Sequence, residues 1–370
     1  MINVLHVRAS SNLLGAEKVV LELCHDRARA FGYTPHLAII HDKRDPIPEL
    51  ATEASKYGIK HKVFTAKSMI DIKCIKILKA YINSNEIDIV HSHGYREDIY
   101  CLLATIHQKT IRTTTNHLWK KGSLKLRVYA FIDSVAMIFY KKIIGVSEPI
   151  VSEMRSIPHL NSNKIELISN GVDCSAFPIK HNSHHRHADT IIRLITISSL
   201  TKEKGHIFLI DALRILADKN IPFKLNIIGD GPLRNEIQDK IIDRELTDRV
   251  TLHGKKNNIK ELLHNSDIFI LPSTIEGLPI SLLEAMSTGT ACIATDVGDV
   301  RKCIDNNFDG LLIPPRNAPE LAKAIIRLAL DDNLLSQLGS NAAQTIRQRY
   351  SNEQMISSYA RIYKQLHKFS

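Results

Sequence analysis

The sequence predicts an α/β protein built from two units, each a parallel sheet with helices on both faces. Short runs of β-branched residues alternate with longer helical patterns along the 370 residues. The strands are continuous apolar runs, which is typical of parallel strands buried on both faces. The alternation stops once, at residues 179–190, where no apolar periodicity is present. We therefore expect two domains, 1–178 and 191–350, joined by a linker at 179–190.

Each half of the chain carries its own series of predicted strands, and a predicted helix, Ala16–Phe31, follows the first of them. In order along the chain, the expected strands are Ile2–Val7, His36–Ile40, Ile87–His91, Ile111–Thr115 and Lys142–Val146, then Ile191–Ser198, Phe223–Ile228, Val250–His253, Ile268–Leu271, Ala291–Ala294 and Gly310–Ile313. Ligands of such folds bind at the carboxyl ends of the strands, so we expect functional residues in the loops there, lining a cleft between the units.

The composition is that of an ordinary globular protein with a basic first half. No apolar run reaches the ~18–20 residues of a membrane span, and the first residues are predicted as a strand rather than a secretory leader. Six cysteines without a C-x-x-C pair indicate reduced thiols in a cytoplasm. Residues 1–180 carry 25 Lys and Arg against 17 Asp and Glu, a net charge of +8; the remainder carries 24 against 22, a net of +2. This asymmetry predicts an anionic partner, with an unevenly charged solvated surface as the alternative.

The densest group of candidate site residues lies in the range 272–298, after a predicted strand. Pro279 is expected at the favoured first-turn position of a helix that Gly289 closes. Amides beside Gly277, at the start of that helix, would then favour an anion such as a phosphate.

Two glutamates, Glu276 and Glu284, lie eight residues apart in this range. On a helix this spacing is ~12 Å, which is too far for the carboxylate pair of a retaining glycosidase, ~5 Å apart. It suits the two ends of one extended ligand. The alternative, a solvated glutamate on a helix, is disfavoured for Glu284 by its apolar context, LLEAM.

Two further loops of the second half carry candidate ligand contacts. Lys204 and Gly205 follow a strand and precede a helix, which predicts a phosphate cradle, although Lys-Gly before a helix is common. Gly229 is expected in a tight turn that lets the backbone approach a ligand. The glycines there are no dinucleotide fingerprint, because the third glycine and the acidic ribose partner are missing.

In the first half, Gly15 lies in the loop between the first strand and the first helix, where Glu17 has a plain explanation in the helix dipole. His93 and His117 each follow the end of a predicted strand, and two histidines at neighbouring strand ends favour a site over a structural role. His91 and His93 alone are too few ligands for zinc. The chain has no P-loop, G-x-S-x-G, H-E-x-x-H or strand-end D-x-D motif.

Taken together, these motifs resemble the retaining glycosyltransferases of family 4, which have two facing Rossmann-like domains, the GT-B fold. The resemblance runs nearly end to end. It rests on E-x7-E at 276–284, LLGAE at 13–17, IVHSHG at 89–94, VSE at 146–148, ISNGVD at 168–173, EKG at 203–205 and GDGPLR at 229–234. It implies that a C-terminal helix, 351–370, crosses back to the N-terminal, acceptor-binding domain.

The resemblance also implies roles for individual residues around a UDP- or GDP-linked sugar bound by the C-terminal domain. Glu284 would bind the ribose hydroxyls, and Glu276 would lie near the donor sugar. Lys204 would neutralise the diphosphate, and His93 would lie at the reacting centre. Further donor contacts would come from Gly15, Ser199, Gly229, Gly277 and Leu278. No metal or other cofactor is expected, because the lysine and the helix dipole stabilise the developing charge.

Three positions depart from the family pattern. Ser199 stands where an arginine is usual, so either Ser199 donates a neutral hydrogen bond to the phosphates or another basic residue replaces it. Leu14 replaces the first glycine of a common pair, and Lys302 stands at a usually acidic position. None of these changes removes Glu276, Glu284 or Lys204.

We expect a retaining glycosyltransferase that builds a surface polysaccharide or glycolipid on a lipid-linked or glycan acceptor. The alternatives are a catalytically silent nucleotide-sugar or glycan-binding protein on the same fold, and another GT-B enzyme such as a sugar-nucleotide epimerase. A nucleic-acid binder has no aromatic or helix-turn-helix signature in its favour.

The segment 109–142 also predicts a peripheral location on an anionic membrane, at the inner face of the cytoplasmic membrane. It interleaves one acidic residue and several apolar ones with eight basic residues: Lys109, Arg112, Lys120, Lys121, Lys125, Arg127, Lys141 and Lys142. The alternative is that 128–140 packs into the core.

Overall fold

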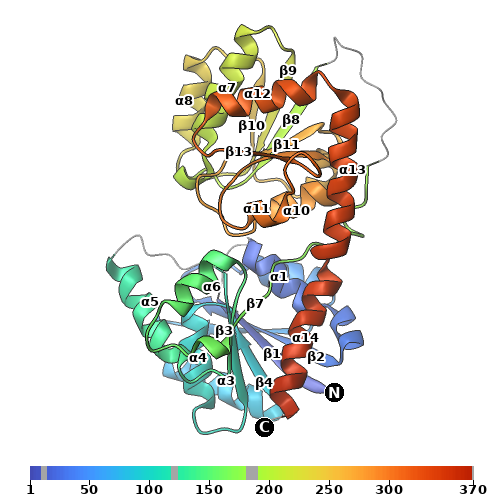
Figure 1. The fold of residues 1–370 in the computed structure, drawn as a ribbon. Helices are drawn as coiled ribbons and strands as arrows, with labels where there is room; N and C mark the ends of the chain where they lie inside the picture. Colours follow the sequence, from blue (N-terminus) through green and yellow to red (C-terminus); the bar gives the residue numbers. More distant parts are fainter. Residues whose placement is uncertain (10–14, 118–123, 181–190, 369–370) are drawn as a thin grey trace. The chain divides into compact units, whose positions relative to one another are not determined.

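The computed structural model describes residues 1–370 except 10–14, 118–123, 181–190 and 369–370 (Figure 1). The chain forms two compact units, which we call unit 1 and unit 2. Unit 1 comprises Met1–Asn170 and Asn352–Ser370, and unit 2 comprises Gly171–Ser351. Leu14, Trp119, Lys120 and most of the predicted linker therefore lie outside the described residues.

Unit 1 contains a seven-stranded sheet in the order β3-β2-β1-β4-β5-β6-β7, and every neighbouring pair is parallel. Its strands are β1 (Ile2–Ala9), β2 (Tyr33–Asp42), β3 (His61–Ala66), β4 (Ile89–Ser92), β5 (Ile111–Asn116), β6 (Lys142–Gly145) and β7 (Ile165–Leu167). The helical elements between them are α1 (Gly15–Cys24), η1 (Asp26–Phe31), α2 (Glu49–Lys56), α3 (Ile72–Ser84), α4 (Tyr95–Thr105), α5 (Leu124–Met137), α6 (Glu148–Arg155) and η2 (Ser162–Lys164).

Helices cover both faces of this sheet because successive strand residues point to opposite sides. In β2, Leu37 and Ile39 pack with apolar side chains of α1 and α2. Their neighbours Ala38 and Ile40 pack with α3 and α4. The continuous apolar run of the strand is therefore buried on both sides, as predicted.

The last helix, α14 (Asn352–Lys368), completes unit 1. Its Tyr359 and Tyr363 are fully buried. The Tyr363 hydroxyl lies 2.6 Å from Nδ1 of His91 on β4, and the Tyr359 hydroxyl lies 3.2 Å from Oγ1 of Thr115 on β5. The predicted return of the C-terminal helix to the N-terminal domain is confirmed.

Unit 2 contains a six-stranded parallel sheet in the order β10-β9-β8-β11-β12-β13. Its strands are β8 (Ile192–Ile197), β9 (Phe223–Ile228), β10 (Val250–Gly254), β11 (Ile268–Leu271), β12 (Ala291–Thr295) and β13 (Leu311–Ile313). Its helical elements are η3 (Lys202–Lys204), α7 (His206–Asp218), α8 (Arg234–Asp243), α9 (Ile259–His264), α10 (Ile280–Ser287), α11 (Val300–Cys303), α12 (Ala318–Ala329) and α13 (Asp332–Arg349).

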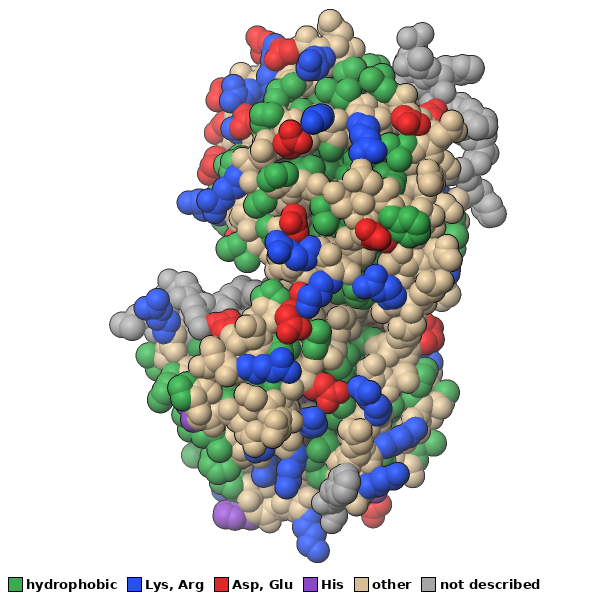
Figure 2. Space-filling view, in the orientation of Figure 1, with side chains coloured by type: hydrophobic (Ala, Val, Ile, Leu, Met, Phe, Trp, Pro, Cys, Tyr) green, Lys and Arg blue, Asp and Glu red, His purple; other side chains and the backbone are tan. Residues whose placement is uncertain are grey.

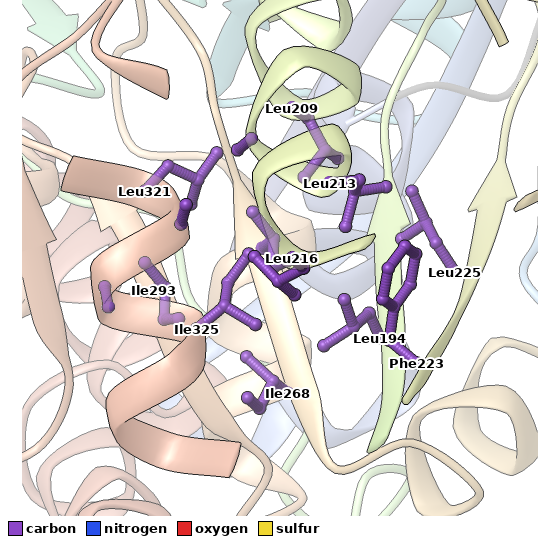
Figure 3. Packing of buried hydrophobic residues seen from close by; sticks show 14 of the residues in the cluster. Leu194, Leu209, Leu213, Leu216, Phe223, Leu225, Ile268, Ile293, Leu321 and Ile325 are labelled. Carbon is purple, nitrogen blue, oxygen red and sulfur yellow. The ribbon is translucent and has the colours of Figure 1, made fainter. Parts of the chain in front are cut away.

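The core of unit 2 is also divided by its sheet. Figure 3 shows one side, where Leu213 of α7 and Ile325 of α12 pack against Leu194 of β8 and Ile268 of β11. On the other side, Phe269 of β11 packs in a second buried cluster with residues of α10 and α13. The two parallel sheets covered by helices on both faces confirm the predicted fold class.

Some predicted boundaries differ from the structure. The predicted helix 16–31 ends at Cys24, and a 3₁₀ helix follows His25, whose Nδ1 accepts from the Arg27 amide. The sequence reading also missed two edge strands, β3 and β7. Five of the six β3 residues are polar, small or half-exposed, and β7 has three residues, so neither shows a continuous apolar run.

The domain boundary lies between 170 and 171 rather than after 178. Residues after Asn170 are tied to unit 2 by hydrogen bonds. The Val172 amide donates to the Tyr350 carbonyl, and Ser287 Oγ donates to the Phe177 carbonyl. In the described part of the chain, no helix combines the length and apolar character needed to cross a membrane.

Candidate active site

The candidate site in unit 2 lies where the strand order reverses. Strands β8 and β11 are neighbours at the centre of the sheet, and the chain continues outward from each in opposite directions. The loops that leave such a switch point diverge and leave room for a ligand. The loop after β8 leads to Lys204, and the loop after β11 leads to Glu276.

These two residues form an ion pair. Lys204 Nζ lies 2.6 Å from Glu276 Oε1, and Ser273 Oγ donates to the same oxygen at 2.7 Å. The side chain of Glu276 is 7% exposed and that of Lys204 is 20% exposed, so the pair is shielded from water but can be reached. Both ion-pair residues were predicted from the sequence as candidate site residues. Ser273, which precedes Glu276 by three residues, was not.

The backbone holds the two loops together. The Thr274 amide donates to the Glu203 carbonyl at 2.7 Å. Gly205 has φ +66°, and a Cβ there would lie 2.1 Å from the Pro272 carbonyl oxygen. Only glycine permits this approach of the two loops, so the Lys-Gly pair has a structural reason as well as a chemical one.

The loop that contains Glu276 and Gly277 is fixed by the turn after β12. Gly298 has φ +53°, and a Cβ there would lie 2.0 Å from the Glu276 carbonyl oxygen. The Asp299 amide donates to the Gly277 carbonyl at 3.1 Å. Leu278, the next residue, is buried in the core of unit 2.

Helix α10 begins one residue later than predicted. Pro279 is its N-cap, with ψ 130°, rather than a first-turn residue, and no side chain caps the helix start. Gly289, with φ +72°, follows the helix end as predicted. The positive end of the helix dipole therefore lies beside the Gly277 loop, where it favours an anion. Glu284 is 3% exposed on this helix, so the prediction that it is not a solvated glutamate is confirmed.

The loops after β8 and β9 contain the remaining candidates of unit 2. Ser199 is exposed, with its hydroxyl 3.4 Å from that of Thr201. At Gly229 the backbone that comes close belongs to the protein: a Cβ would lie 1.9 Å from the Ser198 carbonyl oxygen. Gly229 therefore allows two loops to pack, and its contact with a ligand stays a prediction.

His206 is a further candidate that the sequence did not predict, although it directly follows Lys204 and Gly205. Its Nε2 lies 3.1 Å from Ser198 Oγ. Burial, with the Lys204 charge as a second cause, lowers the pKa of His206 to about 4. The imidazole is therefore neutral at pH 7.

In unit 1 the strand order reverses between β1 and β4. Gly15 is the first residue of α1, and the loop before it lies outside the described residues. His93 follows β4 and is fully buried; its amide donates to the Val7 carbonyl at 3.1 Å. The structure thus brings His93 to the switch point of unit 1, and its place at the reacting centre stays a prediction.

His93 is the middle member of a row of histidines. Its Nε2 lies 3.0 Å from His6 Nδ1, and its Nδ1 lies 3.3 Å from His117 Nε2. Burial lowers the pKa of His6 and of His117 to about 3 and places that of His93 well below 6.5. Each neutral ring has one N–H, so the row forms a chain of hydrogen bonds with a single direction.

Three of the histidines, His6, His91 and His93, could offer ligands to a metal, because one ring nitrogen of each lies within 4.8 Å of the others. However, the rings of His91 and His93 are stacked, with centroids 4.3 Å apart. Both nitrogens of His91 lie within hydrogen-bond distance of the Tyr363 and Thr115 hydroxyls. A metal would have to break these contacts, so the arrangement suits a hydrogen-bonded row better.

Arg8 is a partly buried residue of unit 1 that the sequence did not predict at the site. It forms ion pairs with Glu17, at 2.7 Å, and with Glu97, at 3.3 Å, and donates to the His93 carbonyl. Glu17 is thus a partner of Arg8, which explains its burial better than the helix dipole does. The pairing holds α1 and α4 against the end of β1.

Comparisons with known proteins agree with these observations. The chain is 28% identical over 301 residues to the UDP-Gal:alpha-D-GlcNAc-diphosphoundecaprenol alpha-1,3-galactosyltransferase of Escherichia coli, and the match covers 75% of each protein. It is 32% identical over 177 residues to the amylovoran biosynthesis glycosyltransferase AmsK of Erwinia amylovora, over 45% of this chain and 42% of that protein. Anabaena Alr3699/HepE, solved with UDP and glucose, has the same fold, with a TM-score of 0.82 at 18% identity over 99% of this chain and 100% of that chain.

The fold and these relatives define the class of the protein, a glycosyltransferase with the GT-B fold. Two family models cover most of the chain: the one described as Glycosyltransferase Family 4 matches residues 14–176, and the one described as Glycosyl transferases group 1 matches residues 179–345. The chain belongs to glycosyltransferase family 4, as its motifs predicted, with relatives in polysaccharide and glycolipid biosynthesis.

Proposed function

We propose that this protein is a retaining glycosyltransferase that moves a sugar from a nucleotide-diphospho sugar to a lipid-linked or polysaccharide acceptor. The observation that carries the proposal is the ion pair between Lys204 and Glu276 at the switch point of unit 2. It places a cation and a carboxylate beside the start of α10, where an anionic ligand is favoured.

In this proposal Lys204 stabilises the leaving group. When the bond between the sugar and the diphosphate breaks, negative charge develops on the diphosphate oxygen. The acceptor hydroxyl oxygen forms the new bond to the sugar, and its proton passes to that diphosphate oxygen. The ammonium group of Lys204 and the dipole of α10 stabilise that charge. We propose that no metal ion is needed for this step.

The other site residues bind and orient the donor. Glu276, which accepts a hydrogen bond from Ser273 Oγ, also accepts hydrogen bonds from the donor sugar. Glu284 accepts hydrogen bonds from the ribose hydroxyls. The amides of Gly277 and Leu278 and the hydroxyl of Ser199 contribute to the diphosphate site. For unit 1 we propose that His93 acts at the reacting centre and that Gly15 lines a loop near the donor phosphates.

A UDP-linked sugar is the donor that we would test first, because the named Escherichia coli relative uses UDP-galactose and the Anabaena structure holds UDP. The acceptor of that relative is attached to diphosphoundecaprenol. A similar acceptor here would require a peripheral location at the inner face of the cytoplasmic membrane.

The test begins with thermal unfolding of the full chain in the presence of UDP-, GDP- and ADP-linked sugars, since a ligand that binds the native state raises its stability. The stabilising donor is then incubated with lipid-linked acceptors, and the anomeric configuration of the product is determined by NMR. We expect transfer with retention. Binding without transfer would support a silent binding protein, and conversion of the donor without an acceptor would support an epimerase; either result overturns the proposal.

A further inference from the structure

Helix α5 of unit 1 keeps an apolar stripe outside the core. Val128, Phe131, Ile132 and Val135 follow one another at helical spacing, and Ile138 and Phe139 continue the stripe past the helix end. Phe131 is 65% exposed and Phe139 is 53% exposed. Residues three and four apart share a helix face, so the four side chains on α5 form one surface, and Ile138 and Phe139 lie in the turn that follows it. We call this surface the α5 stripe.

The opposite face of the same segment is buried. Ala130, Asp133, Met137 and Tyr140 are each at most 8% exposed. The expectation that 128–140 packs into the core is therefore right for one face and wrong for the other. Figure 2 shows hydrophobic side chains along the left edge of unit 1, where α5 lies in Figure 1. A contiguous exposed apolar surface of this kind marks a contact with a partner or a membrane.

Cations lie at both ends of the α5 stripe. Arg112 Nε donates to the Phe139 carbonyl at 3.1 Å, and Lys164 Nζ donates to the Ile138 carbonyl at 3.0 Å. Arg127 and Lys141, at the two ends of the stripe, are exposed.

Acidic groups do not offset this charge. Residues 127–142, all of them described, include a single acidic residue, Asp133, which is 1% exposed and faces inward. Glu166, on the neighbouring strand β7, is paired with Lys142 and Arg361. The surface of this segment is therefore apolar in the middle and positive at its margin.

We infer that the α5 stripe docks the protein on an anionic lipid bilayer, with the apolar side chains among the acyl chains and the cations of its two ends at the headgroups. Helices with an apolar face and basic flanks lie in the interface plane in this way. A second copy of the chain is a poorer occupant, because a symmetric contact would bring the two positive margins together. A nucleic acid offers no apolar partner for Phe131 and its neighbours.

The inference rests on the membrane location in the proposed function, but it concerns a surface rather than the donor site. The sequence predicted a membrane contact that includes Lys120 and Lys121, which lie outside the described residues. The α5 stripe instead consists of side chains whose exposure is known. The donor site in unit 2 is not altered by changes on α5, so docking and donor binding can be measured independently.

The test uses flotation of the full chain with vesicles of phosphatidylcholine alone or with about one third phosphatidylglycerol. We expect binding to the anionic vesicles and little to the neutral ones, with weaker binding at high salt. A variant with V128S, F131S and I132S should bind at least about tenfold less. A variant with R127E and K141E should bind less by about fivefold or more per residue.

Matched controls lie on unit 2. Ile242, Phe308 and Leu330 are exposed apolar residues, and I242S, F308S and L330S together should leave vesicle binding unchanged. The charge control is K255E with K256E, both exposed. Thermal unfolding and UDP binding of all variants should match the unchanged protein, which shows that they are folded.

Two results would overturn the inference. One is that the serine variant still floats with anionic vesicles as the unchanged protein does. The other is that the unchanged protein forms a dimer that the serine variant loses, with no flotation, which would make the stripe a contact between copies. If docking fails while transfer to a detergent-dispersed acceptor continues, the proposed function stands and only the docking surface is wrong.

Discussion

The ammonium group of Lys204 and the carboxylate of Glu276 lie 2.6 Å apart, although 72 residues separate them in the chain. The adjacent strands β8 and β11 bring their loops together. In the unliganded protein the lysine is therefore already partnered, so a diphosphate that binds to Lys204 must compete with Glu276. Because of this competition, we expect opposite effects on diphosphate binding from removing Glu276 and from removing Lys204.

The Glu276→Gln variant should bind UDP more tightly and turn over more slowly. The change removes the anion that competes for Lys204, which favours the diphosphate, while the sugar loses a charged acceptor. A charge-assisted hydrogen bond is worth ~1.5–3 kcal/mol. Calorimetry with UDP and steady-state kinetics measure the two effects. Glu203→Gln, on an exposed neighbour, is the control and should change neither; equal small losses in both quantities for Glu276→Gln would contradict the role assignment.

Replacing Lys204 with Gln should lower turnover by about 10²–10³, the usual loss when one group that stabilises a developing charge is removed. Lys202, in the same 3₁₀ turn and exposed, provides the control Lys202→Gln. Activity of the unchanged protein should survive a chelator of divalent cations. Activity that is lost with the chelator and restored by Mg²⁺ or Mn²⁺ would refute the metal-free step.

Replacing Glu284 with Gln should weaken binding of the nucleoside but not of the phosphates. Loss of one or two charge-assisted hydrogen bonds to the ribose costs ~1.5–3 kcal/mol each. Calorimetry with UDP and, separately, with inorganic diphosphate measures the difference. If both ligands lose affinity equally, Glu284 acts on the packing of α10 rather than on the ribose.

Replacing Asp98 with Asn should change how stability depends on pH. Asp98 is 1% exposed, and burial raises its pKa to about 6. Because the unfolded carboxyl has a pKa near 3.8, the folded state holds more protons between these values, so the contribution of this carboxyl to stability falls as the pH rises from about 4 through 6. The gain in stability of the Asp98→Asn variant over the unchanged protein should be larger at pH 8 than at pH 5 in urea unfolding. A gain independent of pH would contradict the raised pKa.

Acid should destabilise unit 1 more than unit 2. The pKa values of His6 and His117 are about 3, and those of His91 and His93 are also well below 6.5, because the protein shields these rings from water. His6, His91 and His93 are fully buried, and His117 is partly buried. The unfolded rings bind protons near pH 6.5, so stability is lost as the pH falls from 6.5 toward 3, by up to ~1.4 kcal/mol per pH unit for each ring. The raised pKa of Asp98 makes the contribution of this one carboxyl to stability increase as the pH falls, but four histidines act in the opposite direction.

Hydrogen exchange at pH 7.5 and 5.0 can assign this loss of stability to one unit. The amides of β1 and β4 should lose protection at pH 5.0, while those of β8 and β11 should lose less, because His206 alone among the site residues of unit 2 has a lowered pKa of this kind. Equal loss of protection in both units would show that the histidine row is not the cause.

Much of the site in unit 2 could be predicted because each residue follows its own strand closely. Lys204 comes seven residues after the end of β8, and Glu276 comes five after the end of β11. The ion pair could not be predicted, because it depends on β8 and β11 being neighbours. Likewise, Gly229 and Ser198 belong to different loops, and only the packed structure shows that they meet.

The histidine row shows the same limit in unit 1. His91 and His93 are visible in the sequence at a strand end, but His6 lies on another strand, and the parallel register that pairs His6 with His91 is a property of the sheet. Nothing local distinguishes His6 from any polar residue in an apolar run. The edge strands β3 and β7 were not predicted for a related reason. A strand with one neighbour is not buried enough to need an apolar sequence.

Unit 1 consists of two segments from opposite ends of the chain, which affects when it can fold during synthesis. The ribosome releases residues 1–170 first, but their fold lacks Tyr359 and Tyr363 until the last segment emerges. The whole of unit 2, residues 171–351, is translated in the interval and has all of its own core. Domains generally fold as units, so unit 1 cannot reach its native state until the end of the chain is available. Until then, His91 and Thr115 lack the two tyrosines as hydrogen-bond partners.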